Sequence, residues 1–525
     1  MAQNIKIQLD PKEVGALIPD ESVVTISSSS ALGCPDLTLK GIGQYFEQNQ
    51  SPKNVTFISP IAAGDMYGVK GIDHVCKEGL IKSIIAGSYP SGPSSFEPPL
   101  IRQFIAEEKV EGYNLPSGVL FQMHRAGATK QPGVFSKVGL ETFIDPRLSG
   151  GALNQRTSKD LINFEIRDGE EWLFYPSIKP NVAIIRATTA DKYGNLTYEH
   201  EGSPLGALDQ AYAAHNNGGI VIAQVKRIVD AGTLDPKHVR VPGILVDYLV
   251  VDPNQMQTTQ TQYDPALSGE HVDDLVDATP LELNLETVIA RRAAKEIQNH
   301  WIVNLGFGIS AVVPQVVREN YRDFEISWVI EQGAVGGIPL TGFAFGCAAN
   351  PDAIMQSTDQ FTLLQGAGFN AAMLSFLEVD QFGNVNVSDL PGRVHVTAGV
   401  GGFADITSSA PVIVFSGYFT AGKKEIKVDS NGIQILKDGD ISKFVSKVSQ
   451  ITFSGNRAKK NSQRAIYVTE RCVIELLDDG LTVTEIAPGV DLHKDILAKA
   501  DFNLNVSPNL KLMDLDIYQD LKVKQ

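Results

Sequence analysis

Cysteine is scarce in this sequence, and signals for export are missing. The 525 residues include four cysteines, Cys34, Cys76, Cys347 and Cys472, which lie far apart and form no CxxC pair. Thiols so few and so scattered argue against a disulfide framework and against a zinc site. The first ten residues, MAQNIKIQLD, contain no charged-then-apolar leader. We therefore expect a reduced protein of the cytoplasm.

Other absences narrow the function further. No stretch approaches the roughly 18 consecutive apolar residues that a membrane span requires. The net charge of −16, from 45 Lys and Arg against 61 Asp and Glu, disfavours nucleic-acid binding. The nine histidines form neither an HExxH motif nor a clustered metal spacing, and no GxSxG elbow of a serine hydrolase occurs. We expect no metal site, no nucleic-acid partner and no membrane segment.

The composition that remains is that of an ordinary globular protein, 43% hydrophobic and 20% charged. Short, nearly continuous apolar runs alternate with helical patterns. These runs occupy residues 23–28, 55–60, 83–88, 181–187, 219–225 and 243–251. Runs of this kind are typical of strands that are buried on both faces. The sequence therefore predicts an α/β fold with largely parallel sheets.

A shift in composition divides the chain. Residues 255–262 read QMQTTQTQ, an acidic stretch follows, and a helical pattern begins at 286–299 behind the capping residue Asn284. We predict an N-terminal domain at 1–253, a linker at 254–285 and a C-terminal domain at 286–525. The first domain carries an insertion at about 89–180, rich in proline and glycine, which is expected to form loops that shape a site or a subunit contact.

Two segments repeat each other at a constant spacing. NVAIIRATTADKYGNLTYE at 181–199 aligns without gaps with NAAMLSFLEVDQFGNVNVS at 370–388. The identical pairs are Asn181 and Asn370, Ala183 and Ala372, Asp191 and Asp380, Gly194 and Gly383, and Asn195 and Asn384. Each copy is typical of a strand, a tight turn and a second strand. We interpret the pair as a duplication; two unrelated strand–turn–strand units are the alternative.

Three glycine-rich segments could approach a ligand. GYFTAGKK at 417–424 nearly matches a P-loop, but Lys424 replaces the magnesium-binding Ser or Thr, so we reject ATP binding there. NLGFGISA at 304–311 loosely matches a dinucleotide pattern, although Pro314 fits poorly in the helix that should follow. GVGGFA at 399–404 follows the strand-like VHVTA and precedes DITSSAP, which does not look helical. Its glycines either direct N–H groups at an oxyanion or form a tight turn.

One carboxylate stands at the end of an apolar run. In WVIEQGAVGGIP at 328–339, Glu331 is followed at once by small residues. A glutamate at the end of a strand is most often solvated or paired. Here the small residues leave room for a bulky ligand beside one fixed carboxylate, so Glu331 is a candidate catalytic residue. Cys34 is better explained as a small buried cysteine, and His124 is either structural or functional.

Several segments together resemble the family I CoA-transferases, specifically the single-chain acetate or propionate type in which both halves are fused. In chain order they are SSSALGCPD (28–36), QPGVFSKVGLETFIDPR (131–147), VVDPNQMQ (250–257), YDPALSGE (263–270), IARRAA with IVNLGFGI (289–309), EQGAVGGIP (331–339), FGCAANPDAI (345–354), DQFGNVNVS (380–388), GVGGFADIT (399–407) and YVTERCVIELLDDGLTVTEIAPGVDL (467–492). The resemblance covers most of the chain. It implies two related open α/β domains of the CoA-transferase (NagB/RpiA-like) type.

The resemblance also implies a mechanism. Glu331 would be the nucleophile that attacks acyl-CoA and forms first an acyl-glutamyl anhydride and then a glutamyl-CoA thioester, with ping-pong kinetics. Backbone N–H groups near Gly402 and Phe403, in one loop with Gly399 and Gly401, would form the oxyanion hole and border CoA. Coenzyme A would be a substrate, with no permanently bound cofactor and no metal. Family members are typically homodimers or homotetramers.

Further substrate-binding candidates follow from the same resemblance. Asn304 and Asn350 match positions near the active site, where their amides would hold acyl or carboxylate oxygens. Many members carry Pro-Gln-Gly where this chain has Ser117 between Pro116 and Gly118, so the role of Ser117 in the acyl pocket is open. For the nucleotide end of CoA, the sequence offers Lys423, Lys424 and the basic stretch RAKKNSQR at 457–464, which most often would be a solvated loop.

The function that we expect is transfer of CoA between a short-chain acyl-CoA and a short-chain carboxylate: acetate, propionate, butyrate or acetoacetate. The nearest alternative is an acyl-CoA hydrolase that uses the same Glu331. A nicotinamide-dependent oxidoreductase built on NLGFGISA, and a silent ligand-binding protein on a sugar-phosphate-isomerase-like fold, are further alternatives.

Overall fold

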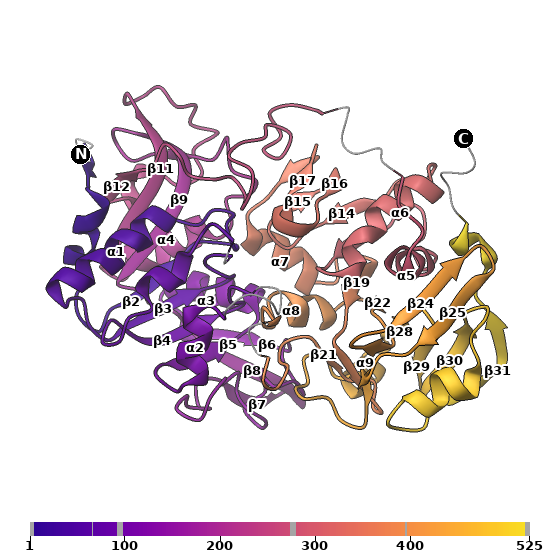
Figure 1. The fold of residues 1–525 in the computed structure, drawn as a ribbon. Coiled ribbons are helices and arrows are strands. Elements are labelled where there is room, and N and C mark those ends of the chain that lie inside the picture. The colour runs from indigo at the N-terminus through magenta and orange to yellow at the C-terminus, as the bar shows by residue number, and fades with distance from the viewer. Residues whose placement is uncertain (1–4, 66, 92–97, 274–279, 394–395, 520–525) are drawn as a thin grey trace.

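The computed structural model describes residues 5–65, 67–91, 98–273, 280–393 and 396–519 (Figure 1). Figure 1 shows one large sheet in each half of the chain, with helix α8 between the two halves. In the first sheet the order is β1-β12-β11-β9-β2-β3-β4-β5, and every pairing along this path is parallel. The α/β fold with parallel sheets, predicted from the apolar runs, is thereby confirmed.

The first half contains these elements: β1 (Ile7–Gln8), β2 (Val23–Ile26), α1 (Asp36–Asn49), β3 (Val55–Ser59), β4 (Ile81–Ala86), α2 (Leu100–Ala106), β5 (Glu111–Asn114), α3 (Ser117–Ala128), β6 (Gly133–Ser136), β7 (Asn163–Arg167), β8 (Glu170–Pro176), β9 (Val182–Asp191), β10 (Leu196–Thr197), α4 (Ala207–Asn216), β11 (Ile220–Val229) and β12 (Tyr248–Val251). Every residue of β9 is buried. Val182 and Ile184 pack with α1, whereas Ala183 and Ile185 pack with α4, so helices cover both faces of this strand.

The second sheet runs β18-β15-β14-β13-β19-β22-β28-β29-β30-β31, and its centre from β14 to β28 is parallel. The elements of this half are α5 (Leu285–Ala294), β13 (Ile302–Leu305), α6 (Val313–Asn320), β14 (Ser327–Val329), β15 (Ala334–Val335), β16 (Ile338–Pro339), β17 (Ala348–Ala349), β18 (Ala353–Ile354), α7 (Ser357–Gln365), β19 (Ala371–Ser375), β20 (Glu378–Asp380), β21 (Val385–Asn386), α8 (Phe403–Thr407), β22 (Val412–Ser416), β23 (Thr420–Ala421), β24 (Glu425–Asp429), β25 (Gly432–Lys437), β26 (Ile441–Ser442), β27 (Phe444–Val445), α9 (Gly455–Lys460), β28 (Arg464–Val468), β29 (Cys472–Leu477), β30 (Gly480–Ile486) and β31 (Asn505–Leu512).

A segment whose described residues form no helix or strand leads from the first sheet to helix α5. β12 ends at Val251, and none of the described residues from there to Leu285 lies in a helix or strand. As expected, Asn284 caps α5 through a side chain that accepts a hydrogen bond from the Thr287 N–H, although the helix ends at Ala294 rather than at 299. The domain limits at 253 and 285 stay a prediction.

The repeated segments have equivalent places in the two sheets. β9 lies between β11 and β2, and β19 lies between β22 and β13. In each copy one carboxylate oxygen of the aspartate, Asp191 or Asp380, accepts the N–H groups of the aromatic residue and of the asparagine in the turn. The asparagine amide, from Asn195 or Asn384, returns a hydrogen bond to the other oxygen. So detailed a match favours the duplication.

Three local predictions were wrong. The run at 243–251 is a strand only in β12, because residues 243–245 form a short 3₁₀ helix and the Gly243 N–H donates to the Asn195 side chain. The insertion at 89–180 is not a set of loops: its described residues include a β6-β8-β7 sheet, with β7 and β8 joined by a two-residue turn. Pro314 lies at the start of α6, where its missing N–H costs nothing.

Candidate active site

Glu331 lies just beyond the carboxyl end of β14. Trp328, Val329 and Ile330 before it are buried, whereas the Glu331 side chain keeps part of its surface accessible. The chain then turns sharply: the Ile330 N–H donates to the Ala334 carbonyl over 3.0 Å. A rigid buried strand therefore presents one carboxylate at the edge of the sheet, where open parallel sheets commonly bind ligands.

The loop of residues 399–403, called the oxyanion loop below, meets this carboxylate. Gly402 lies directly against the Glu331 carboxylate, close enough for its N–H to lower the pKa of that group. A Cβ on residue 402 would overlap the Glu331 Oε2 atom, so only glycine allows this approach. Gly399 and Gly401 have φ angles of +102° and +51°, which favour glycine. The structure thus brings Glu331 and Gly402 together, as the sequence suggested.

Two expectations about the neighbourhood of this loop were wrong. Residues 403–407 form helix α8, although DITSSAP did not look helical. Gly402 precedes this helix in a helical conformation and allows the turn to begin. Within VHVTA, residues 394–395 lie outside the described part, and residues 396–398 form no strand.

Burial changes the acidity of Glu331. Removal from water raises the pKa of its carboxyl group from 4.5 to about 7, and the nearby Gly402 N–H opposes this shift. Asp405, fully buried in α8, also has a pKa raised to about 7, mainly by burial and in part by the charge of Glu331. A nucleophilic carboxylate whose pKa is near neutral is more basic than an ordinary one and still ionises at physiological pH.

The raised pKa predicts that Glu331 destabilises the fold at neutral pH. Between pH 4.5 and about 7 the folded state binds more protons at this site than the unfolded chain, so its stability falls as pH rises. We expect Glu331→Gln to match the parent in Tm below about pH 4.5 and to exceed it above pH 7 by the equivalent of up to about 3 kcal/mol. Calorimetry across this range tests the expectation; parallel curves of Tm against pH would contradict it.

The first half of the chain holds the oxyanion loop in place. The Gly401 N–H donates to the Gly87 carbonyl over 2.7 Å, and the Ser117 N–H donates to the Gly401 carbonyl over 2.9 Å. The Asn114 Oδ1 atom accepts the Val400 N–H over 2.8 Å. The site therefore forms where the two halves meet, with the carboxylate from the second half and the supports of the loop from the first.

The other predicted residues are placed less directly. Asn304 is fully buried, and its amide donates to the Val329 carbonyl over 3.0 Å, so it supports β14 next to Glu331. Both side-chain atoms of Asn350 bond to the backbone of Asp273 over 2.9 Å, which ties it to the segment between the sheets. Ser117 is fully buried against Gly87. Roles in substrate binding for these three residues stay predictions.

Comparison with known proteins decides the family. The sequence profile described as Coenzyme A transferase matches residues 11–252. Acetate CoA-transferase YdiF of Escherichia coli (strain K12) is 40% identical over 515 residues, which are 98% of this chain and 95% of that protein. The chain belongs to the coenzyme A transferase family. Caffeate CoA-transferase of Acetobacterium woodii is 39% identical over 98% of this chain and 97% of its own length.

Solved structures agree with this assignment to the CoA-transferases. The apoenzyme of acyl-CoA transferase YdiF from Escherichia coli O157:H7 matches with a TM-score of 0.90 and 39% identity, over 98% of this chain and 96% of that chain. A thioester complex of YdiF with CoA matches with the same TM-score. The fold and the enzyme class that the sequence resemblance implied are therefore confirmed.

The basic residues suggested for the nucleotide end of CoA have other partners in this CoA-transferase. Residues 457–460 lie in α9, where Lys460 pairs with Glu141 over 2.7 Å and Arg457 pairs with Glu171 over 3.5 Å. The Lys424 ammonium lies 3.5 Å from the centre of the Tyr418 ring. The stretch RAKK thus joins the two halves of the chain, rather than forming a solvated loop.

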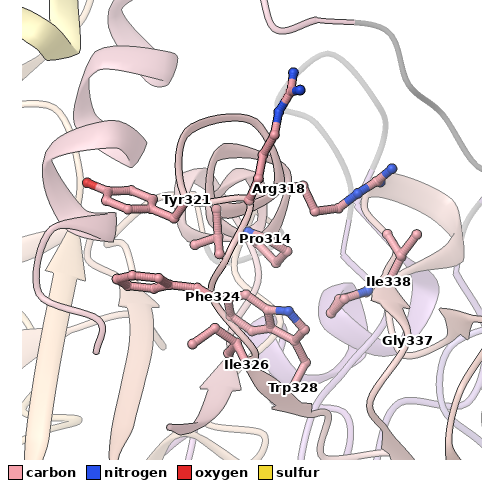
Figure 2. A pocket seen from close by; sticks show the side chains of 11 residues that line it. Pro314, Arg318, Tyr321, Phe324, Ile326, Trp328, Gly337 and Ile338 are labelled. Carbon is pink, nitrogen blue, oxygen red and sulfur yellow. The ribbon is translucent and has the colours of Figure 1, made fainter. Parts of the chain in front are cut away.

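A cavity of about 350 Å³ lies beside β14 (Figure 2). Figure 2 shows Tyr321 and Phe324 on one side and Ile338 on the other, with Trp328 between them. Glu331 does not line the cavity.

Among the described residues, no helix has both the length and the apolar character needed to cross a membrane. Nor does any group of three or more His, Cys, Asp or Glu in that part of the chain suit a metal ion.

The cysteines and His124 are buried within the fold. The four cysteines are free and buried, as expected for Cys34. His124 is fully buried between Thr25 and the Leu120 carbonyl, and burial lowers its pKa to about 4, so it stays neutral. Roles for Asn114 and Asp405 were not predicted, because their contacts lie across the interface between the halves.

Proposed function

We propose that this CoA-transferase moves CoA between a short-chain acyl-CoA and a short-chain carboxylate, such as acetate, propionate, butyrate or acetoacetate, through a thioester on Glu331. What supports Glu331 as the nucleophile is its contact with the Gly402 N–H at the accessible end of a buried strand. Short-chain specificity is supported by the relative named acetate CoA-transferase. We further propose a cytoplasmic homodimer or homotetramer that takes CoA as a substrate and holds no permanent cofactor.

The reaction proceeds by four acyl transfers without loss of the thioester free energy. The ionised Glu331 attacks the acyl-CoA carbonyl, CoA leaves as a thiolate, and an acyl-glutamyl anhydride forms. The thiolate then attacks the glutamyl carbonyl, which releases the first carboxylic acid as its anion and leaves a glutamyl-CoA thioester. An incoming carboxylate reverses both steps. Each tetrahedral intermediate carries an oxyanion, for which the N–H groups near Gly402 and Phe403 are candidate donors.

Borohydride trapping tests this mechanism. The enzyme is mixed with acetyl-CoA without an acceptor and then reduced. Borohydride converts a glutamyl thioester to an alcohol, so the peptide with Glu331 should lose one oxygen and gain two hydrogens. Formation of the adduct should increase with pH up to about 7 and then level off, because the nucleophile must be ionised. An unmodified Glu331 during turnover would exclude the proposed intermediate.

The same mixture of enzyme and acetyl-CoA, without borohydride, distinguishes a transferase from a hydrolase. After the adduct has formed, acetate, propionate, butyrate and acetoacetate are added one at a time. A transferase converts the bound CoA to the matching acyl-CoA at a rate that depends on the acid. Release of free CoA at one rate, whichever acid is present, would identify a hydrolase instead.

A further inference from the structure

Helix α3 begins at the interface between the two halves without a cap from its own segment. Its N-cap residue, Pro116, makes no side-chain cap hydrogen bond. Asp405 from the other half supplies the acceptor instead: its Oδ2 atom accepts the Gly118 N–H over 3.0 Å, and the nearby Val119 N–H helps to lower the pKa of its carboxyl group. A carboxylate at a helix N-terminus accepts otherwise unpaired amides and interacts favourably with the helix dipole.

The Asp405 carboxylate is fully enclosed. Its exposed fraction is 0%, and its Oδ1 atom accepts the amide of Gln365 on α7 over 2.7 Å. The charge of Glu331 contributes to the raised pKa of Asp405. The charge of Asp405 in turn contributes to the raised pKa of the Tyr175 phenol. A buried carboxylate with this many donors holds the elements that supply them in one arrangement.

The position of Asp405 in α8 connects this bridge to the nucleophile. Helix α8 is a single short turn, and Asp405 lies three residues beyond Gly402, whose N–H meets Glu331. A shift of Asp405 would therefore move the start of α8 and the direction of that N–H. Asn114 fixes the other end of the loop, because it accepts the Val400 N–H and donates to the Gly87 carbonyl over 2.6 Å.

We propose that Asp405 is a positioning residue, which fixes the oxyanion loop against the N-terminus of α3 and thereby aims the Gly402 N–H at the nucleophile. It does not touch the substrate. This inference deepens the proposed function and rests on it, because it takes Glu331 as the nucleophile. Misplacement of a catalytic group by about 1 Å can cost on the order of 100-fold in rate, so the bridge matters for turnover as well as for folding.

The variant that tests this role is Asp405→Asn, which keeps the shape of the side chain but loses its charge and one acceptor. We expect kcat for CoA transfer to fall on the order of 10- to 100-fold, with a much smaller change in KM. Formation of the Glu331 adduct should slow by a similar factor, because the misplaced loop no longer aims the Gly402 N–H at the nucleophile. A merely structural role would lower Tm without slowing adduct formation in the folded enzyme.

Asp359→Asn is the matched control. Asp359 also joins the two halves, through Arg125 on α3 over 3.4 Å, but it is half-exposed and does not contact the oxyanion loop. It should keep kcat within about twofold, as expected for an exposed ion pair. If Asp405→Asn folds poorly, Gln365→Met removes one donor to Asp405 from a partly exposed position and should lower kcat in the same direction.

Two failures can be told apart. If the parent forms no adduct on Glu331, the proposed nucleophile is wrong. A lower kcat in Asp405→Asn than in Asp359→Asn would still show that turnover depends on the oxyanion loop. If the parent forms the adduct and Asp405→Asn forms it at the same rate, Asp405 has no positioning role. Equal losses of kcat in both variants would also overturn the proposal, since any contact between the halves would then suffice.

Discussion

Glu331→Ala is expected to abolish CoA transfer, by roughly 10⁴-fold or more, and to leave the fold intact. Loss of the nucleophile removes both covalent intermediates, and no other group can carry CoA between the two acids. The fold should persist because the change removes a buried carboxylate whose ionisation is unfavourable. Steady-state transfer from acetyl-CoA to propionate, with CoA binding and Tm measured on the same sample, checks the result.

Glu325→Ala is the control for this loss. Glu325 lies shortly before β14, and its side chain is 82% exposed beside His300. It should keep parental activity.

Glu331→Asp should be badly impaired as well, because its carboxylate retreats by one methylene from the position beside Gly402. Near-parental turnover in Glu331→Ala would refute the glutamyl mechanism, whatever the other variants do.

Local sequence patterns were sufficient to predict much of the fold. Strand β9, and β11 over residues 221–225, are buried on both faces, so their nearly continuous apolar runs stand out in the sequence. The cap of α5 by Asn284 and the repeated turn at Asp191 and Asp380 depend on contacts within a few residues. Such short-range interactions can be predicted because the residue types alone determine them.

The support of the site depends on contacts between distant segments, and these were missed. Asn114 reaches Val400 across 286 positions, and Asp405 reaches Gly118 across 287. Asn114 belongs to none of the quoted motifs, and Asp405 lies in GVGGFADIT without a pattern that would show its partner in the other half of the chain. The nucleophile itself could be proposed because Glu331 ends a recognisable strand; the groups that aim at it are visible only once the halves are placed together.

For Asn350 the residue type left two partners open, and its role in substrate binding stays a prediction. Its place in the family pattern suggested a hydrogen bond to substrate, yet its amide binds both polar atoms of the Asp273 backbone. An asparagine amide matches a peptide group as well as it matches a carboxylate, so residue type could not separate the two partners.

Gly402→Ala carries the second large effect, because it changes the site without disturbing the backbone. Residue 402 has φ −85° and ψ −1°, which alanine adopts freely. The added methyl group would overlap the Glu331 Oε2 atom and press on the Phe361 ring, so the carboxylate must leave its position. We expect adduct formation and turnover to fall on the order of 10²- to 10³-fold, as for loss of an oxyanion-hole donor, while Tm changes little.

Gly366→Ala separates this effect from the cost of adding a methyl group. Gly366 ends α7 with nearly the same backbone angles, φ −82° and ψ 7°, and a Cβ there would meet only the carbonyls of Thr362 and Leu363. It should keep parental turnover and a similar Tm. Equal losses of turnover in both variants would mean that small residues near α7 are needed for packing alone. A loss confined to Gly402→Ala would mean that the Glu331 carboxylate must occupy the space next to residue 402 in order to react. The two substitutions differ mainly in the atoms that the new methyl group contacts.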